Sequence, residues 1–253
     1  MTLSAAVLRT EGLSKSFDSL AVAHDISIAL PPGARHALIG PNGAGKTTLV
    51  NLITGQLRPD SGRVLLAGAD ITTKSRAARV KAGLARTFQI NALFPDLTPI
   101  EAVMLAVCER KGTAGQFWRS LAAHGDSVDE AFGILQQLGL ADVATRTTRT
   151  LAYGQQRLLE IGLALATRPQ VLLLDEPAAG VPKGESAELF AVIAGLPGDI
   201  SVLFIEHDMN LVFRFASRII VLVAGRVLME APPDVIRTDQ RVRDVYLGQA
   251  HHA

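Results

Sequence analysis

The sequence predicts a mixed α/β core with a helical subdomain inserted midway along the chain. Short apolar runs typical of strands occur in residues 1–89 and again in residues 167–231. The intervening residues 90–166 show the helical spacing of apolar side chains instead. We therefore expect one domain, with its core built from two separated stretches of chain and a short helical tail over residues 232–253.

The expected elements follow from local signals along the chain. The predicted strands of the first half are residues 7–9, 26–30, 37–39, 63–67 and 84–88. The predicted strands of the second half are residues 171–174, 201–205, 218–223 and 226–229. In the helical region, Thr98-Pro99-Ile100-Glu101 is a capping box with proline at the first helical position. A further helix is predicted over residues 128–138, ending at Gly139.

Composition excludes several classes of protein. The chain has 253 residues, of which 48% are hydrophobic, which argues against general disorder. Lys and Arg total 25 against 24 Asp and Glu, so charge gives no reason to expect a nucleic-acid partner. The one cysteine, Cys108, is expected to pack in the core as a small apolar side chain. No signal peptide and no membrane-spanning run is apparent, so we expect any membrane role to come through a partner.

A phosphate-binding loop is the most specific motif. Residues 40–47 fit the pattern G-x-x-x-x-G-K-[ST], placed between an apolar run and a helix. In this motif, backbone N–H groups and the helix N-terminus cradle phosphate, the lysine reaches the β- and γ-phosphates, and the hydroxyl ligates Mg²⁺. The predicted nucleotide-binding residues are Gly40, Pro41, Asn42, Gly43, Ala44, Gly45, Lys46, Thr47 and Thr48.

Acidic residues and a histidine follow two other apolar runs. Asp175 and Glu176 end the run Val171-Leu172-Leu173-Leu174, which is typical of a buried parallel strand. Asp175 is predicted to hold Mg²⁺, and Glu176 to act as general base on the attacking water. His207 follows residues 201–205 and is predicted to contact the γ-phosphate.

These motifs occur in the order found in ATP-binding-cassette (ABC) transporter ATPases, and the chain resembles that family over nearly its whole length. The resemblance implies a RecA-like phosphate-loop NTPase core, an antiparallel β subdomain and the helical insertion. It implies that Phe17 stacks on adenine and that Gln89 lies near the metal and the reacting phosphate. A segment that matches the family signature lies just before a helix expected to begin near Gln155. The resemblance implies that this segment binds the ATP of a second subunit. Its residues are Leu151, Ala152, Tyr153, Gly154 and Gln155.

The chain is similar to the branched-chain amino acid importer ATPases in particular. The shared segments are Arg-Thr-Phe-Gln at 86–89, Leu-Ala-Tyr-Gly-Gln-Gln at 151–156, Glu-Pro-Ala-Ala-Gly at 176–180 and Ile-Glu-His-Asp-Met at 205–209. The resemblance implies ATP and Mg²⁺ as cofactors and a place on the cytoplasmic face of the membrane. It implies as partners a second ATPase subunit, permease subunits and, indirectly, a periplasmic solute-binding protein. Related importers carry urea, amides or aromatic acids, and these remain alternative cargoes.

Two positions depart from the usual family pattern. Where the family signature usually has a serine, this chain has Ala152, so no side-chain hydroxyl is available there to bind phosphate. An Asp or Asn usually ends the loop that follows the catalytic glutamate, and that position is Pro182. We expect weaker or asymmetric communication between the two ATP sites of a dimer.

Three alternatives to a transporter ATPase agree less well with the sequence. A soluble ABC ATPase of repair or translation usually has a long coiled coil or fused cassettes, which this sequence lacks. A regulatory cassette without activity does not explain the intact Lys46, Asp175, Glu176 and His207. A small-molecule kinase with a phosphate loop does not explain the signature segment.

Overall fold

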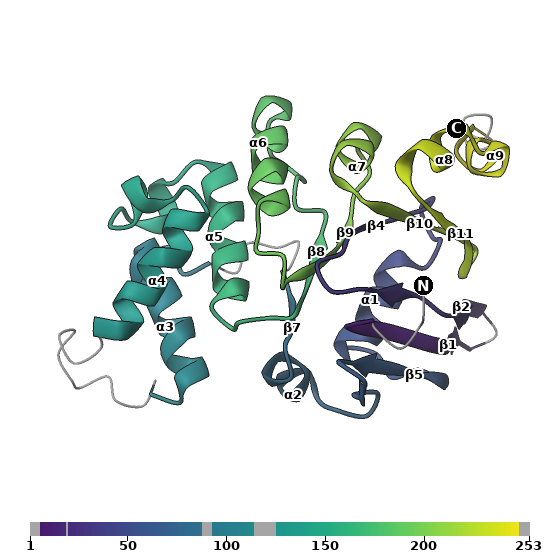
Figure 1. Ribbon diagram of the computed structural model, residues 1–253, viewed down its shortest axis with the longest axis horizontal. Helices are drawn as coiled ribbons and strands as arrows, with labels where there is room; N and C mark the ends of the chain where they lie inside the picture. The colour runs from purple at the N-terminus through teal and green to yellow at the C-terminus, as the bar shows by residue number, and fades with distance from the viewer. Residues whose placement is uncertain (1–5, 19, 88–92, 114–124, 248–253) are drawn as a thin grey trace.

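The computed structural model describes residues 6–18, 20–87, 93–113 and 125–247. Within them lie an antiparallel sheet, a mainly parallel sheet and a group of helices at one end (Figure 1). This mixed α/β core with a separate antiparallel β subdomain is the arrangement that the sequence predicts. The exact limits of the subdomains at residues 89, 166 and 231 stay predictions.

The antiparallel sheet has the strand order β2-β1-β5-β6, with β3 paired to β1. Its strands are β1 (Leu8–Phe17), β2 (Leu20–Ile26), β3 (Ala29–Leu30), β5 (Ser61–Leu66) and β6 (Ala69–Asp70). The single strand expected over residues 26–30 is therefore wrong, because β2 and β3 are separate. Thr10 explains the break: its hydroxyl donates to the Ile26 carbonyl at 2.9 Å and accepts from the Ile28 N–H at 3.0 Å.

The second sheet has the order β11-β10-β4-β9-β8-β7. Its strands are β4 (Arg35–Ile39), β7 (Leu84–Arg86), β8 (Val171–Asp175), β9 (Ser201–Ile205), β10 (Arg218–Val223) and β11 (Arg226–Ala231). All neighbours are parallel except the β10–β11 hairpin. Strands β8 and β9 are buried along their whole length, which explains their continuous apolar sequences.

Alternation along the parallel strands divides the core into two layers. Leu172 and Leu174 of β8 face the layer that includes the helical subdomain, whereas Leu173 faces the layer with the first helix and the antiparallel sheet. Successive strand residues point to opposite faces, so one strand supplies both cores. Each layer covers one face of the sheet that carries the candidate site.

The α-helices of the described residues are α1 (Lys46–Thr54), α2 (Arg76–Lys81), α3 (Pro99–Lys111), α4 (Gly125–Gln137), α5 (Tyr153–Leu165), α6 (Lys183–Ala194), α7 (Met209–Phe215), α8 (Pro233–Thr238) and α9 (Gln240–Leu247). Helices α3, α4 and α5 gather at the end of the molecule away from the antiparallel sheet, and the other helices lie along the sheets (Figure 1). The Thr98–Glu101 capping box is confirmed at the start of α3, and Cys108 on that helix is buried as expected. Among the described residues, no helix has the length and apolarity needed to cross a bilayer.

A buried arginine closes the C-terminal end of α1. Arg79 of α2 is 1% exposed, and its guanidinium donates to the carbonyls of Leu52 at 2.8 Å and Ile53 at 2.5 Å. It also donates to the carbonyls of Thr72 at 2.6 Å and Lys74 at 3.1 Å. The last carbonyls of a helix lack the usual partner within the helix, and the Leu52 carbonyl otherwise accepts a long bond from the Gly55 N–H at 3.3 Å, so Arg79 supplies charged donors to this buried helix end.

Arg79→Met should lower the free energy of unfolding by about 2–4 kcal/mol, because buried carbonyls lose charged donors. Urea denaturation without nucleotide measures this change. The control is Arg76→Met on the exposed side of the same helix, which should change stability by less than about 0.5 kcal/mol. Equal effects of the two substitutions would show that the carbonyl contacts do not stabilise α1.

Candidate nucleotide site

Three loops with candidate residues leave neighbouring strands at one edge of the parallel sheet. The phosphate loop follows β4, Glu176 follows β8, and His207 follows β9 after one intervening residue. In the sheet β9 lies between β4 and β8, and all three run in parallel. Their carboxyl ends therefore meet, which is where open α/β sheets bind ligands.

Two glycines of the phosphate loop are required by packing from outside the loop. A side chain on Gly40 would collide with the carbonyl oxygen of Leu222 on β10. At Gly45, whose φ is 98°, a Cβ would lie 2.6 Å from the carbonyl oxygen of Val22 on β2. The phosphate loop therefore packs closely against β10 at Gly40 and against β2 at Gly45, and its position depends on both strands.

Lys46, the first residue of α1, is more enclosed than the sequence suggested. We expected it at a solvent-open loop, but it is 8% exposed, and its Nζ donates to the carbonyls of Gly40 at 2.7 Å and Pro41 at 3.1 Å. The loop folds around the amine and holds it in place. Burial lowers the pKa of Lys46, and the nearby carboxylates of Glu176 and Asp175 act in the opposite direction.

The loop and two of the other candidates line one pocket of about 230 Å³. The lining residues are Val22, Asn42, Gly43, Ala44, Gly45, Lys46, Thr47, Thr48, Glu176, Ile205 and His207. Backbone amides at the start of α1 and the Lys46 ammonium make this an anion-binding surface. A carboxylate and an imidazole lie on its opposite side. Val22 and Ile205 were not predicted, because only the pairing of their strands places them here.

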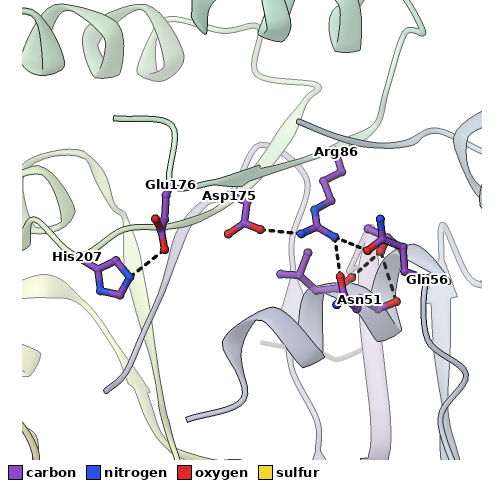
Figure 2. Close-up of polar contacts among 8 residues, drawn as sticks. Asn51, Gln56, Arg86, Asp175, Glu176 and His207 are labelled. Atoms are coloured by element: carbon purple, nitrogen blue, oxygen red, sulfur yellow. Dashed lines mark hydrogen bonds and ion pairs between the residues drawn. The ribbon is translucent and has the colours of Figure 1, made fainter. Parts of the chain in front are cut away.

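Glu176 and His207 contact each other (Figure 2). Glu176 Oε1 and His207 Nε2 are 3.0 Å apart, and the Glu176 N–H donates to the Ile205 carbonyl at 3.0 Å. Glu176 has a φ of 48°, a left-handed backbone that non-glycine residues rarely adopt. Such strain is concentrated at functional sites, because the surrounding structure must maintain it. The phosphate contact of His207 stays a prediction.

Asp175 is placed beside the pocket and not in its lining. Its carboxylate accepts from Arg86 Nη2 at 2.6 Å, and the two side chains are 9% and 10% exposed (Figure 2). Sequence reasoning used Arg86 only as part of the Arg-Thr-Phe-Gln segment and missed this ion pair. The pairing of β7 with β8 brings the two residues together.

Glu206 is a second residue that sequence reasoning missed. It is 6% exposed and accepts from the N–H groups of Ala178 at 2.9 Å and His207 at 3.1 Å. Burial raises the pKa of Glu206, while the N–H groups of Ala178, His207 and Asp208 lower it and the charge of Glu176 raises it. One buried carboxyl therefore ties the loop after β8 to the loop after β9, and it positions both Glu176 and His207.

The signature segment is structured differently from the expectation. We expected a helix beginning near Gln155, but α5 begins at Tyr153. Ala152 is its N-cap and has no acceptor side chain, while its N–H donates to Gln155 Oε1 at 3.1 Å. Tyr153 and Gly154 thus contribute first-turn N–H groups. These residues do not line the pocket formed with the phosphate loop.

Pro182 has a similar position at the start of α6. It is the N-cap of that helix, is exposed, and makes no side-chain capping bond. An Asp or Asn at such a position could accept from the first-turn N–H groups, and proline cannot. The departures at Ala152 and Pro182 therefore each leave a helix start without a polar cap.

Phe17 is a further described candidate that lies outside this pocket. Phe17 at the end of β1 is 44% exposed, so it does not pack in the core, and Lys15 Nζ lies 5.7 Å from the centre of its ring. Gln89 lies outside the described residues.

Comparison with known proteins decides the family. Residues 23–179 match the family model described as "ABC transporter", and residues 226–252 match the model described as "Branched-chain amino acid ATP-binding cassette transporter". The chain is a member of the ABC transporter family. It is therefore an ATP-binding and ATP-hydrolysing transporter subunit, as the sequence predicts.

Curated relatives cover the whole cassette. The chain is 36% identical to the high-affinity branched-chain amino acid transport ATP-binding protein BraF of Pseudomonas aeruginosa, over 98% of this chain and 100% of the relative. It is 37% identical to LivG of Escherichia coli, which has the same description, over 98% and 100%. A crystal structure of an ABC transporter cassette in its ADP conformation aligns with a TM-score of 0.82 and 32% identity, over 96% of this chain and 99% of that chain.

Phe17→Ala should weaken binding of ATP and GTP alike, by about 1–3 kcal/mol, because an aromatic face stacks on any base. Isothermal calorimetry with each nucleotide measures the two affinities. Phe132→Ala is the matched control, since Phe132 is a similarly exposed phenylalanine on α4 of the helical region. Unchanged affinities for both nucleotides in Phe17→Ala would contradict adenine stacking.

Proposed function

We propose that this cassette drives the import of branched-chain amino acids or related small solutes across a cell membrane. The observation that carries the ATPase part of the proposal is that the phosphate loop, Glu176 and His207 line one pocket. The relatives BraF and LivG are described as branched-chain amino acid transport proteins, and they support the choice of cargo. Urea, amides and aromatic acids are the alternative cargoes.

The assignment of roles starts with the phosphates of ATP. The backbone of residues 42–48 and the Lys46 ammonium neutralise phosphate charge, and Phe17 stacks on the adenine. Lys46 already lies against the loop carbonyls of Gly40 and Pro41, so little side-chain freedom is lost when it binds phosphate. We place the nucleotide with its triphosphate along this loop.

Thr47 and Asp175 fit Mg²⁺ by the chemistry of their donors. Thr47 is exposed in the pocket and Asp175 lies beside it, and both offer the hard oxygen atoms that Mg²⁺ prefers. In the described part of the chain, no group of three or more His, Cys, Asp or Glu residues is arranged to hold a metal. A magnesium ion here would complete its coordination with phosphate oxygens and water, as is usual for nucleotide sites. The bound ion supplies charge neutralisation at the β- and γ-phosphates. Gln89 is proposed as a further ligand.

Glu176 is the proposed general base. It accepts the proton of the water that attacks the γ-phosphorus, and the contact with His207 and the tether through Glu206 fix its direction. Lys46, Gln89 and His207 stabilise the negative charge on the transferred phosphoryl group. The contacts of the loops after β8 and β9 maintain the left-handed backbone of Glu176, whose side chain lines the pocket.

The second half of each site is proposed to come from another cassette. The first turn of α5, at Tyr153 and Gly154, would cover the γ-phosphate of ATP held by the partner, through N–H groups rather than a serine hydroxyl. The partners are a second cassette, identical or homologous, and transmembrane permease subunits, which the cassette contacts at the cytoplasmic face of the membrane. A periplasmic or extracellular solute-binding protein acts through those permeases.

Co-purification from native membranes tests the cargo. Membrane subunits and a solute-binding protein should be recovered with the cassette. Calorimetry on that binding protein should give tighter binding of leucine, isoleucine or valine than of urea, amides or aromatic acids. A preference for one of the latter would replace the proposed cargo while leaving the ATPase assignment intact.

Lys46→Ala should abolish ATP binding or hydrolysis without unfolding the protein, because phosphate charge is no longer neutralised. Nucleotide affinity and phosphate release measure this, and circular dichroism checks the fold. The control is Lys74→Ala, at an exposed position in the loop before α2. Wild-type turnover in purified Lys46→Ala would overturn the assignment.

Glu176→Gln should lower the hydrolysis rate by about 10²–10⁴ while keeping ATP affinity, because the amide keeps the shape but cannot accept a proton. The variant should accumulate as an ATP-bound dimer in size-exclusion chromatography. The test is made in the native assembly as well, since Pro182 can weaken a dimer of identical chains. Hydrolysis at the wild-type rate in that assembly would exclude Glu176 as the base.

A further inference from the structure

The ion pair between Arg86 and Asp175 is nearly removed from solvent. Nη2 of Arg86 and Oδ2 of Asp175 are 2.6 Å apart, and their side chains are 10% and 9% exposed. A carboxylate in such a place is costly unless a cation or several donors compensate its charge. Arg86 therefore provides the positive charge that Asp175 needs when no metal is bound.

Arg86 is itself fixed from the other side. Its Nη1 donates to Asn51 Oδ1 at 2.7 Å and to Gln56 Oε1 at 3.1 Å. Figure 2 shows the guanidinium between Asp175 and these two amide groups. Asn51 belongs to α1, the helix that begins with Lys46, so Arg86 connects the Asp175 carboxylate to the helix of the phosphate loop. The planar guanidinium suits such a bridge, because it donates in several fixed directions at once.

We propose that Arg86 is a positioning residue that takes the place of Mg²⁺ at Asp175 in the nucleotide-free cassette and competes with the metal when nucleotide binds. The inference rests on the proposed role of Asp175 as a metal ligand. With magnesium bound, two cations would share one carboxylate, and like charges beside the same group repel each other. Arg86 thus stabilises the Asp175 carboxylate when magnesium is not bound to it and lowers the affinity of the site for magnesium.

The proposal predicts opposite effects in the two states of the protein. Removing the Arg86 charge leaves Asp175 unpaired in the nucleotide-free cassette, so that state loses stability. The same change removes the competitor of Mg²⁺, so the metal binds more tightly in the presence of ADP. A residue with only a packing role would lower the stability of both states equally and leave the magnesium requirement unchanged.

Thermal unfolding of the full chain tests this with Arg86→Gln. The melting temperature is measured in EDTA without nucleotide, and then at a fixed saturating ADP concentration while Mg²⁺ is titrated. Arg86→Gln should melt lower than wild type in EDTA, and its Mg²⁺ midpoint should fall by about tenfold, within the usual range of coupling between two sites. An unchanged or higher Mg²⁺ midpoint overturns the proposal.

Matched variants separate the possible failures. Arg63→Gln removes an arginine from an exposed pair with Glu11 and should leave the midpoint at its wild-type value. Asp175→Asn should raise the midpoint, and adding Arg86→Gln to it should lower the midpoint by less than Arg86→Gln does in the wild type, because the shared carboxylate is gone. If Asp175→Asn leaves the midpoint unchanged, the proposed metal ligand is wrong, which is distinct from a failure of Arg86 alone.

A milder change covers the case in which Arg86→Gln does not fold. Gln56 is exposed, and Gln56→Ala removes one anchor of the guanidinium while keeping its charge. The ion pair is then held less firmly, so the Mg²⁺ midpoint should shift in the same direction by a smaller amount. An unchanged midpoint in Gln56→Ala would then overturn the proposal.

Discussion

Parallel strands end at the same edge of their sheet, and the order β4-β9-β8 decides which loops share that edge. The phosphate loop, Glu176 and His207 are far apart in the sequence and meet only because of this order. The tether from Glu206 then adjusts the loops after β8 and β9 relative to each other. Everything chemical in the pocket depends on this pairing of strands, and the apolar residues of both core layers maintain it.

Features that are encoded locally were predicted well. The continuous apolar sequences gave β8 and β9, and the Thr98–Glu101 pattern gave the start of α3. The start of α5 was misplaced because Ala152 lacks the polar side chain that marks most helix starts. The strand over residues 26–30 was also misjudged, because Thr10 interrupts it from a different part of the chain.

The candidate site shows the same division. The phosphate loop and the acidic residues at the end of β8 were recognisable because their spacing alone indicates their chemistry. The contacts that position these residues could not be recognised in the sequence. Arg86 bonds to Asp175 from the neighbouring strand β7, and Glu206 after β9 bonds to the loop after β8. Lys46 was expected in the open, and its enclosure follows from the fold of its own loop around the amine. Contacts between residues far apart in the chain produce no repeating pattern in the sequence, so they cannot be predicted from it.

The packing of Gly40 against the Leu222 carbonyl has a consequence for the synthesis of the protein on the ribosome. Strand β4 is made early, yet its two neighbours in the sheet, β9 and β10, come from the last quarter of the chain. Until those strands emerge, β4 has exposed edges and the phosphate loop lacks its backing. Contacts of such long sequence separation form slowly, and unpaired edges are prone to associate with other chains. The nascent cassette therefore acquires its nucleotide-binding loop only after β9 and β10 have been made, and the residues before them depend on protection until then.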